Sequence, residues 1–411
     1  MNFGIAYTKE QEAFRKEVRA WFEKNVPADK RMPIDQEKDY TPELHEWHKK
    51  FQKVLGKQGW LFPTYPKEYG GGGLSADQAA ILEEEMERMR IPGRIASTYT
   101  PNVFLVWATE EQKQKFLVPL LKGEKTEHMR MTEPQSGADL ANIKNRAVKD
   151  GDDWLLSGQN VFISAHGDED YLPGPFMTDP DAPRHRNLGY FVVPNPSQGL
   201  LIKEMDLLVG RRQKQVYLDN VRVSADYLIG GDHQGWQVHS THLEAEHGGG
   251  GRAFPHDEVV EKLLEWVKTT RADGHTVGSD PVRAQVAVDA KLDAHVDTLM
   301  AKRTFWMYQN RMPIQYEGNV HNVHNRLYDL RNAIRVRDVM GLTSLLNVRE
   351  PLAPAGGLFE VDQRSAAGQR HAAGSTNIAK VILARRIGIS RTKERAAPTP
   401  STAAHVSAPG A

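Results

Sequence analysis

The sequence predicts an α+β fold in which a helical N-terminal region, a small β-domain and a helical C-terminal region follow one another. Three observations predict this order. Apolar residues recur at helical spacing at first, then alternate with polar residues, and helical spacing finally returns. We therefore expect domains at residues 1–124, 125–227 and 228–394, followed by a disordered tail at 395–411 that is rich in Ala, Pro, Ser and Thr.

Four amphipathic helices are expected in the N-terminal region. Thr8 and Gln11 have the spacing of a capping box for the first helix, and Pro42 occupies the first position of the second. The acidic run at residues 83–85 is interpreted as a solvated face of the third helix. We expect the four helices at residues 8–26, 41–55, 75–89 and 109–122.

Short strands in the middle region predict a small barrel or sandwich of about 100 residues. Asp150-Gly151 has the composition of a hairpin turn. Pro173 and Pro175 interrupt the pattern at residues 171–176, because a central strand does not accept proline, so we expect an edge or an irregular loop there. The strands are expected at residues 144–148, 154–157, 161–164, 188–194, 200–205 and 213–218.

Helical spacing returns at Gly235-Trp236, and the four glycines at 248–251 are expected to break this helix. Within the C-terminal region, His321 and His324 have a spacing compatible with metal ligands. They lack a clear carboxylate partner, so we interpret them as surface or interface histidines and expect no metal. Further helices are expected at residues 257–270, 281–306, 320–340 and 377–389, with a loop at 351–357.

Composition narrows the classes of function. Lys plus Arg and Asp plus Glu number 53 each, so charge does not favour nucleic acid or an anionic membrane as the main partner. The absence of cysteine excludes disulfides, thiolate metal sites and cysteine nucleophiles. The sequence shows neither the pattern of a signal peptide nor an apolar run long enough to span a bilayer. We expect a soluble, cytoplasmic protein.

The stretch Met131–Asp139, where the helical region gives way to strands, has the residue types of a ligand-binding loop. Thr132 offers a hydroxyl group, Pro134 stiffens the turn, and Gly137 allows the backbone to approach a ligand closely. The alternative is an ordinary connection between a helix and a strand.

Five blocks carry a family resemblance. They are Met131-Thr132-Glu133-Pro134 with Gly137 and Asp139, Val161–Ser164, Asp179–Arg186, Val216–Val223 with Gly235-Trp236, and Ala373–Ile378 leading into Ile382–Arg386. Taken in this order over residues 1–395, they resemble the acyl-CoA dehydrogenases. The resemblance implies an FAD-dependent flavoprotein of fatty acid metabolism that converts an acyl-CoA thioester to the 2-enoyl-CoA. It also implies electron transfer to an electron-transfer flavoprotein, and assembly as a homodimer or homotetramer, or as a heteromeric complex.

The resemblance also implies which residues bind the flavin. Met131 and Thr132 are expected at the flavin ring, Phe162 is expected to pack on it, and the Ser164 hydroxyl is expected near N5. Ser375-Thr376-Asn377 in the last block is expected to contribute further cofactor contacts. The alternative is that Thr132 and Ser164 are ordinary strand residues and that Phe162 is a core aromatic.

The reaction needs a base that takes the proton from the α carbon. Many family members carry a glutamate immediately before the glycine of the late loop, where this chain has Ala373. A minority branch carries the glutamate ten residues beyond the aromatic of the Gly-aromatic pair, which counts from Trp236 to Glu246. Glu244 lies about 200° around the same helix and is the alternative. A further alternative is that both glutamates are solvated, and Glu317 in Tyr316–Asn319 is a third candidate base.

The chain departs from the family pattern at several places. Ala138 replaces a serine, His247 replaces the arginine after the helix-borne glutamate, and residues 271–285 replace an Arg-x-x-Phe-Gly block. Ala373, Ala138 and the missing arginine block motivate the first rival function. This rival is a catalytically inactive or half-active subunit of a heteromeric dehydrogenase. The other is a flavin oxidase or monooxygenase of the same fold. The sequence leaves the length and branching of the acyl chain open.

Overall fold

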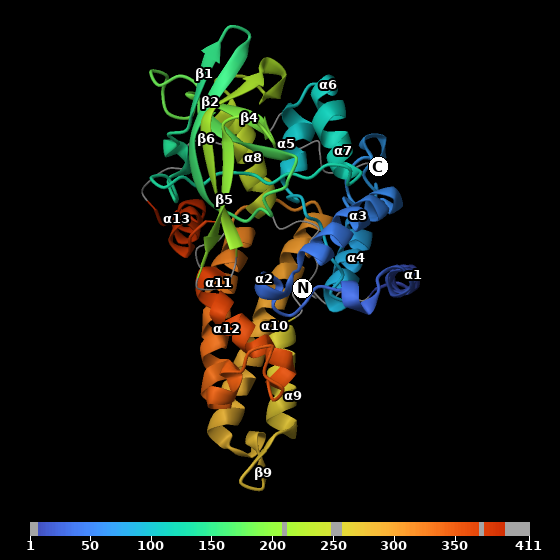
Figure 1. The fold of residues 1–411 in the computed structure, drawn as a ribbon. Coiled ribbons are helices and arrows are strands. Elements are labelled where there is room, and N and C mark those ends of the chain that lie inside the picture. Colours follow the sequence, from blue (N-terminus) through green and yellow to red (C-terminus); the bar gives the residue numbers. More distant parts are fainter. Residues whose placement is uncertain (1–6, 208–211, 248–256, 370–373, 391–411) are drawn as a thin grey trace. The chain divides into compact units, whose positions relative to one another are not determined.

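The computed structural model describes residues 7–207, 212–247, 257–369 and 374–390 (Figure 1). It confirms the α+β fold, with helices before and after a central sheet. The described residues group into two compact units. The first takes residues 7–41, 76–91 and the described part of 247–390, and the second takes 42–75 and the described part of 92–246. The expected boundaries at 124/125 and 227/228 remain predictions.

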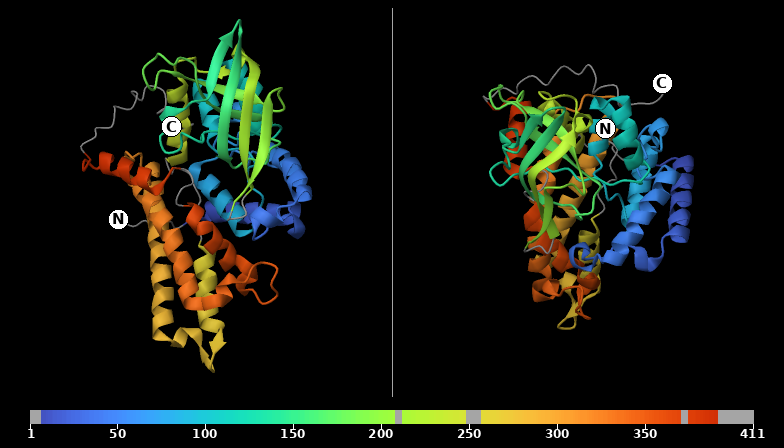
Figure 2. Two further views of the ribbon diagram at one scale, coloured as in Figure 1. Left: turned by 60° about the vertical axis from the view of Figure 1, so that its left-hand side comes forward. Right: turned by 45° about the horizontal axis from the view of Figure 1, so that its top comes forward.

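The first unit is mainly helical. Its long helices α10 and α11 run side by side, and α9 packs against both (Figure 2). Apolar side chains of α9, α10 and α11, with Phe359 of α12, form its core. A short hairpin of β8 (Arg271–Ala272) and β9 (His275–Thr276) follows α9. The helices are α1 (Lys9–Asn25), α2 (Gln36–Asp39), α4 (Ala76–Arg88), α9 (Glu258–Thr269), α10 (Pro281–Gln309), α11 (Glu317–Met340), α12 (Leu358–Gln369) and α13 (Thr376–Arg386).

Helices α1 and α4 pack together through buried charges. The capping box of Thr8 and Gln11 at the start of α1 is confirmed. Glu85 of α4 is fully buried, and it accepts hydrogen bonds from Arg15 Nη1 at 2.9 Å and Arg19 Nε at 2.8 Å. The interpretation of residues 83–85 as a solvated face is therefore wrong for Glu85, because α4 turns this carboxylate toward the arginines of α1.

The second unit contains α3 (Pro42–Gln58), α5 (Thr100–Trp107) and α8 (Gly235–His247). The helix expected at residues 109–122 consists of α6 (Glu110–Gln112), a π-helical turn and α7 (Val118–Leu121). Helix α5 was not expected, because its short apolar sequence has buried residues on several sides and lacks a side-chain cap. No helix among the described residues of either unit is long and apolar enough to cross a membrane.

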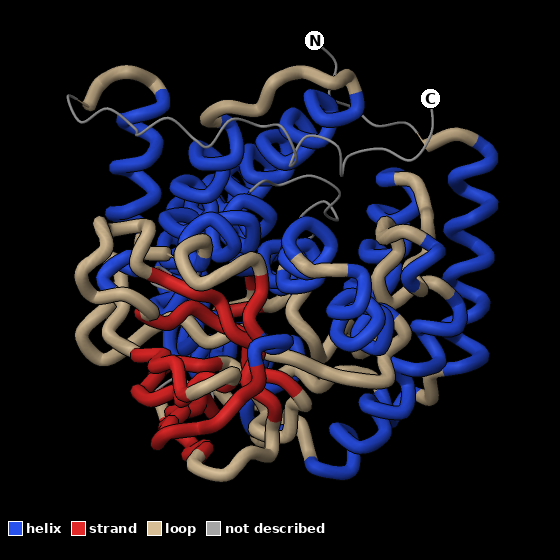
Figure 3. Tube along the Cα trace, turned by 90° about the horizontal axis from the view of Figure 1, so that it is seen from above, coloured by secondary structure: helices blue, strands red, loops and turns tan. Residues whose placement is uncertain are grey.

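Seven strands of the second unit form one sheet in the order β5-β6-β2-β1-β3-β4-β7. Figure 3 shows the strands gathered together in red. The hairpin turn at Asp150-Gly151 joins β1 to β2, as expected. The strands expected at 154–157 and 161–164 are parts of one strand, β2, which is interrupted by two irregularities in its pairing with β6. The strands are β1 (Arg146–Asp150), β2 (Asp153–Ile163), β3 (Tyr171–Met177), β4 (Leu188–Pro194), β5 (Leu200–Asp206), β6 (Arg212–Ser224) and β7 (Leu228–Ile229).

Strand β3 corrects the expectation of an edge or irregular loop at residues 171–176. It pairs with β4 along its whole length and lies between β1 and β4 in the sheet. The segment 126–130 runs along its other side, where Arg130 N donates to Pro173 O at 2.9 Å. Because Pro173 meets this segment through its carbonyl oxygen, its missing N–H removes no bond from the ladder with β4.

Candidate functional site

Two segments of the second unit that carry residues expected at the flavin lie side by side. The backbone N–H of Val161 donates to Thr132 O at 2.9 Å. The side-chain amide of Asn160 lies 3.3 Å from Met131 O and 3.3 Å from Thr132 O. These bonds hold Met131 and Thr132 beside the end of β2, where Phe162 lies in the strand and Ser164 directly follows it. We call Met131, Thr132, Phe162 and Ser164 the wall.

Phe162 is the most unusual residue of the wall. It has a φ of +58°, in the left-handed region that non-glycine residues rarely adopt, and its side chain is 53% exposed. The irregularity between Asn160 and Ile163 in the pairing of β2 with β6 turns its ring outward. Such a conformation costs about 1–3 kcal/mol and occurs frequently at functional sites. Phe162 is therefore not a core aromatic.

Ser164 shares the outward direction of Phe162. Both side chains are exposed, whereas Val161, Ile163 and Ala165 between and beside them are buried. Thr132 is half-buried. An exposed aromatic ring and two accessible hydroxyl groups fit a flat ligand with polar edges, such as the isoalloxazine ring of FAD.

A buried polar network supports the wall from behind. Asn160 Oδ1 accepts hydrogen bonds from Arg130 Nη1 at 2.9 Å and from Asn145 Nδ2 at 3.0 Å. Asn145 Oδ1 in turn accepts from Gln159 N at 2.8 Å, and a Cβ at Gly158 would lie 1.9 Å from this oxygen. The network therefore restricts the backbone conformation of the wall residues. Sequence reasoning missed Arg130, Asn145 and Asn160, and the only local signal was the glycine two residues before Asn160.

Glu133, directly after Thr132, fastens the first segment of the wall. Its carboxyl group accepts the backbone N–H groups of Lys144 at 2.7 Å and Asn145 at 3.0 Å. Burial raises the pKa of Glu133, although these hydrogen bonds oppose the increase. Gln135 Nε2 also donates to this carboxyl group at 2.8 Å, so both of its oxygens already accept hydrogen bonds from the protein.

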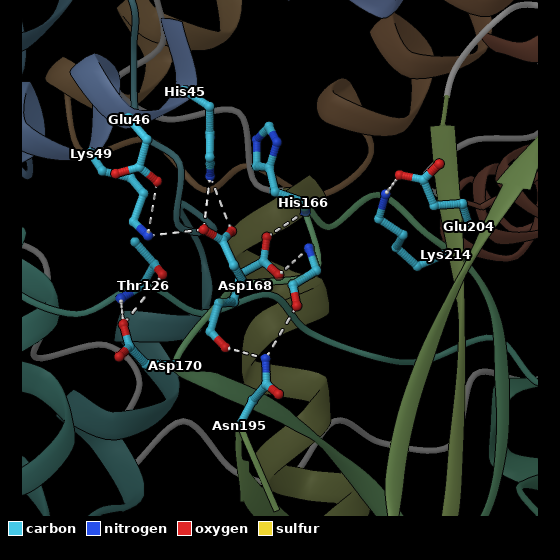
Figure 4. Close-up of polar contacts among 12 residues, drawn as sticks. His45, Glu46, Lys49, Thr126, His166, Asp168, Asp170, Asn195, Glu204 and Lys214 are labelled. Atoms are coloured by element: carbon cyan, nitrogen blue, oxygen red, sulfur yellow. Dashed lines mark hydrogen bonds and ion pairs between the residues drawn. The ribbon is translucent and has the colours of Figure 1, made fainter. Parts of the chain in front are cut away.

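The loop after Ser164 is tied to helix α3 (Figure 4). Asp168 lies 3.0 Å from His45 Nε2 and accepts a hydrogen bond from Lys49 Nζ at 2.9 Å. The His45 hydrogen bond, with Lys49, lowers the pKa of Asp168 although burial opposes the decrease. Glu169 accepts the N–H groups of His166 at 2.5 Å and Gly167 at 2.9 Å, which closes the loop on itself. These bonds fix residues 166–169, which follow shortly after Ser164, against α3 and against one another.

Helix α8 carries the two glutamates proposed as the base. Glu246 is partly buried and Glu244 is exposed. His239 and His242, which precede Glu246 by seven and four residues on the same stripe, are both buried. This pattern favours an inward direction for Glu246 over Glu244, but the role of either residue remains a prediction. The side chain of His247 lies outside the described residues.

Ser375, Thr376 and Asn377 belong to the first unit, at the start of α13. Ser375 caps this helix by accepting from Ile378 N at 3.3 Å, Thr376 is buried, and Asn377 is exposed. Cofactor contacts of these residues therefore remain a prediction. Ala373, the glycines at 248–251 and the tail at 395–411 lie outside the described residues.

Glu317 and His321 have structural partners within the first unit. Glu317 is 7% exposed and accepts the N–H groups of Gln315 at 2.9 Å and Tyr316 at 3.1 Å at the start of α11. Burial alone would raise its pKa, but these bonds lower the pKa of Glu317, which suits a capping carboxylate better than a base. His321 Nε2 lies 3.0 Å from Asp297 Oδ1, a carboxylate partner that was not apparent from the sequence.

Two family models match consecutive regions of the chain. Residues 8–124 match the family model for the N-terminal domain of acyl-CoA dehydrogenases, and residues 128–221 match the model for their middle domain. The two matches together cover just over half of the chain.

Individual relatives agree with these matches. The chain is 28% identical to acyl-CoA dehydrogenase FadE26 of Mycobacterium tuberculosis, over 70% of this chain and 74% of that protein. It is 29% identical to FadE29 of the same organism, over 66% of this chain and 70% of that protein.

Solved structures share the fold. The steroid ACAD Tcur3481-Tcur3483 superposes with a TM-score of 0.83 at 24% identity, covering 96% of this chain and 100% of that chain. The ChsE4-ChsE5 complex of Mycobacterium tuberculosis superposes with a TM-score of 0.79 at 23% identity, covering 95% and 100%.

Proposed function

Because this chain belongs to the acyl-CoA dehydrogenase family, we propose that it uses FAD to convert an acyl-CoA thioester to the 2-enoyl-CoA. The electrons would pass to an electron-transfer flavoprotein. The observation that carries this proposal is the wall, where the exposed ring of Phe162 stands beside the hydroxyl-bearing residues Thr132 and Ser164. The left-handed backbone of Phe162 supports the proposal, because such conformations occur frequently at functional sites.

In this proposal Met131 lines the flavin site, and the other three wall residues contact the ring through their side chains. Phe162 packs on the flavin ring, and the hydroxyls of Thr132 and Ser164 bind its polar edge. When bound, FAD supplies a two-electron acceptor. Glu246 takes the α proton, and the hydrogen of the β carbon leaves with both bonding electrons. The partly buried position of Glu246, on the same stripe of α8 as the buried His239 and His242, favours this role over exposed Glu244.

Assembly into a homodimer or homotetramer is part of the proposal. Helix α10 exposes Val288, Leu292, Val296 and Leu299 at helical spacing, although isolated surface apolar residues are common. A stripe of four on one helix favours contact with another chain.

The proposal also includes the last motif block and the metabolic role. Ser375, Thr376 and Asn377 would contribute further contacts to FAD, and the enzyme would act in cytoplasmic fatty acid metabolism.

A second candidate is a subunit of a heteromeric dehydrogenase. Ala138 removes a hydroxyl from the stretch that begins with the wall. The names of two structures with the same fold, Tcur3481-Tcur3483 and ChsE4-ChsE5, each join two proteins. One of them is named a steroid ACAD, so steroid-derived CoA thioesters belong among the substrates to be tested. The same-fold oxidase or monooxygenase is the third candidate.

Anaerobic bleaching of the flavin tests these candidates. The purified protein, supplied with FAD, is mixed with straight-chain, branched and steroid-derived CoA thioesters, and absorbance is recorded. We expect a yellow protein that one of these classes bleaches. A protein that remains colourless with excess FAD contradicts the main proposal, and rapid reoxidation by air favours the oxygen-using candidate. Activity that appears only with a second, homologous chain favours the heteromeric candidate.

Two matched variants test the base. Glu246→Gln should keep the oxidised flavin spectrum and lose bleaching, because the amide cannot accept the α proton. Glu244→Gln, on the same turn of α8, should bleach like the wild type. Normal bleaching by Glu246→Gln would show that the base lies elsewhere.

A further inference from the structure

Arg130 is a fully buried cation next to the wall. Its side chain is 0% exposed and lies two residues before Thr132. Nε donates to Leu172 O at 3.0 Å, and Nη1 donates to Asn160 Oδ1 at 2.9 Å. The guanidinium carbon lies 4.3 Å from the centroid of the Phe176 ring. Among the described residues, no carboxylate forms an ion pair with Arg130, and Nη2 has no hydrogen-bond partner.

The surrounding chain is shaped to hold this side chain. A Cβ at Gly174 would lie 2.4 Å from Arg130 O and 3.4 Å from the guanidinium carbon, so only glycine fits there. Burial lowers the pKa of Arg130 to about 10, while Tyr190 and Glu133 oppose the decrease. The guanidinium is therefore protonated at neutral pH. A buried charge whose hydrogen-bond acceptors are all neutral is costly, so its position next to the wall calls for a functional reason.

The positive charge is coupled to the wall through one residue. Asn160 accepts from Arg130 with its oxygen, and its amide nitrogen lies 3.3 Å from the carbonyl oxygens of Met131 and Thr132. We propose that Arg130 supplies a fixed positive charge behind the wall, which stabilises the negative charge that a bound flavin gains on reduction. This inference rests on the proposed function.

The charge balance of the reaction explains why such a cation matters. The α carbon loses a proton to Glu246, and the β carbon loses a hydrogen together with both bonding electrons. The acyl-CoA is thereby oxidised to the 2-enoyl-CoA, and the flavin, the oxidant, gains one negative charge. In a buried environment, a nearby cation acts on that charge with little screening by water. Arg130 would therefore raise the reduction potential of the flavin without touching the substrate.

The test separates the effect of the positive charge of Arg130 from the effect of its structural contacts. Arg130→Met and Arg130→Gln remove the charge, and Arg130→Lys keeps it. The midpoint potential of bound FAD is measured by anaerobic titration against reference dyes, with circular dichroism and FAD affinity recorded for each variant. A matched control is Arg15→Met, which neutralises a buried arginine of α1 that is paired with Glu84 and Glu85.

We expect the neutral variants to shift the ratio of oxidised to reduced flavin at a fixed potential about tenfold. For a two-electron couple this is a midpoint about 30 mV more negative. Arg130→Lys and Arg15→Met should stay close to the wild type. A neutral variant that binds FAD with the wild-type potential overturns the proposal.

A measurement on the wild type covers the case in which neither neutral variant folds. If a cation stabilises the reduced flavin as an anion, the midpoint potential at neutral pH should fall with the slope of one proton per two electrons. A slope of two protons per two electrons overturns the proposal. Failure of the wild type to bind FAD at all would instead contradict the proposed function.

Discussion

Glu127 is a fully buried carboxyl group whose neutralisation should stabilise the protein. It is 0% exposed, and neither of its oxygens completes a hydrogen bond among the described residues. Burial raises the pKa of Glu127 to about 8, although Thr100 and the backbone of Ser97 favour the ionised form and Glu169 opposes it. The side chain is therefore protonated at neutral pH in the folded protein and ionised in the unfolded chain.

The sign and size of the effect follow from proton linkage. Because the folded state holds the proton more tightly, the free energy of unfolding falls as pH rises from about 4.5 to about 8. The full difference in pKa corresponds to roughly 5 kcal/mol, of which roughly 3 kcal/mol is lost between pH 4.5 and pH 7. Glu127→Gln keeps the shape of the neutral acid and cannot ionise in either state, so it should abolish this loss.

Chemical denaturation followed by tryptophan fluorescence at pH 5, 6, 7 and 8 measures the effect. The stability of Glu127→Gln relative to the wild type should increase with pH and level off above about pH 8. Glu68→Gln, at an exposed position in the same unit, is the control and should show no such trend. A difference between Glu127→Gln and the wild type that is independent of pH would refute the reasoning.

Three further predictions concern the wall, the first unit and assembly. Phe162→Ala should weaken FAD binding at least about tenfold, because an aromatic contact that FAD buries contributes roughly 1.5–3 kcal/mol. Equilibrium dialysis measures the affinity for FAD, and an unchanged affinity would show that Phe162 does not contact the flavin. Glu85→Ala should lower the free energy of unfolding by about 3 kcal/mol, because Arg15 and Arg19 lose their shared carboxylate. Thermal unfolding measures this change, and Glu17→Ala, at an exposed position of α1, is the control. Leu292→Glu on α10 should shift the protein to smaller assemblies in analytical ultracentrifugation, and an unchanged assembly would exclude this face of α10.

Local signals in the sequence were sufficient for many of the elements. The capping box at Thr8 and Gln11 and the turn at Asp150-Gly151 involve neighbouring residues, and both occur as expected. The order of helical and strand regions likewise follows from periodicity. Helix α5 and strand β3 were not predicted, because their sequences lack a clear period. Helix α5 buries residues on several sides, and β3 is stabilised by its pairing with β4.

The ordered motif blocks also determined the family, and through it the expectation that Thr132, Phe162 and Ser164 bind a flavin. Only the tertiary structure showed that these segments lie side by side, that the Phe162 ring is exposed in a left-handed backbone, and that Arg130 is buried behind them. The physical reason is distance along the chain. Burial and hydrogen bonding join Arg130 to Asn160, 30 residues later in the chain, and no local pattern encodes such a pair.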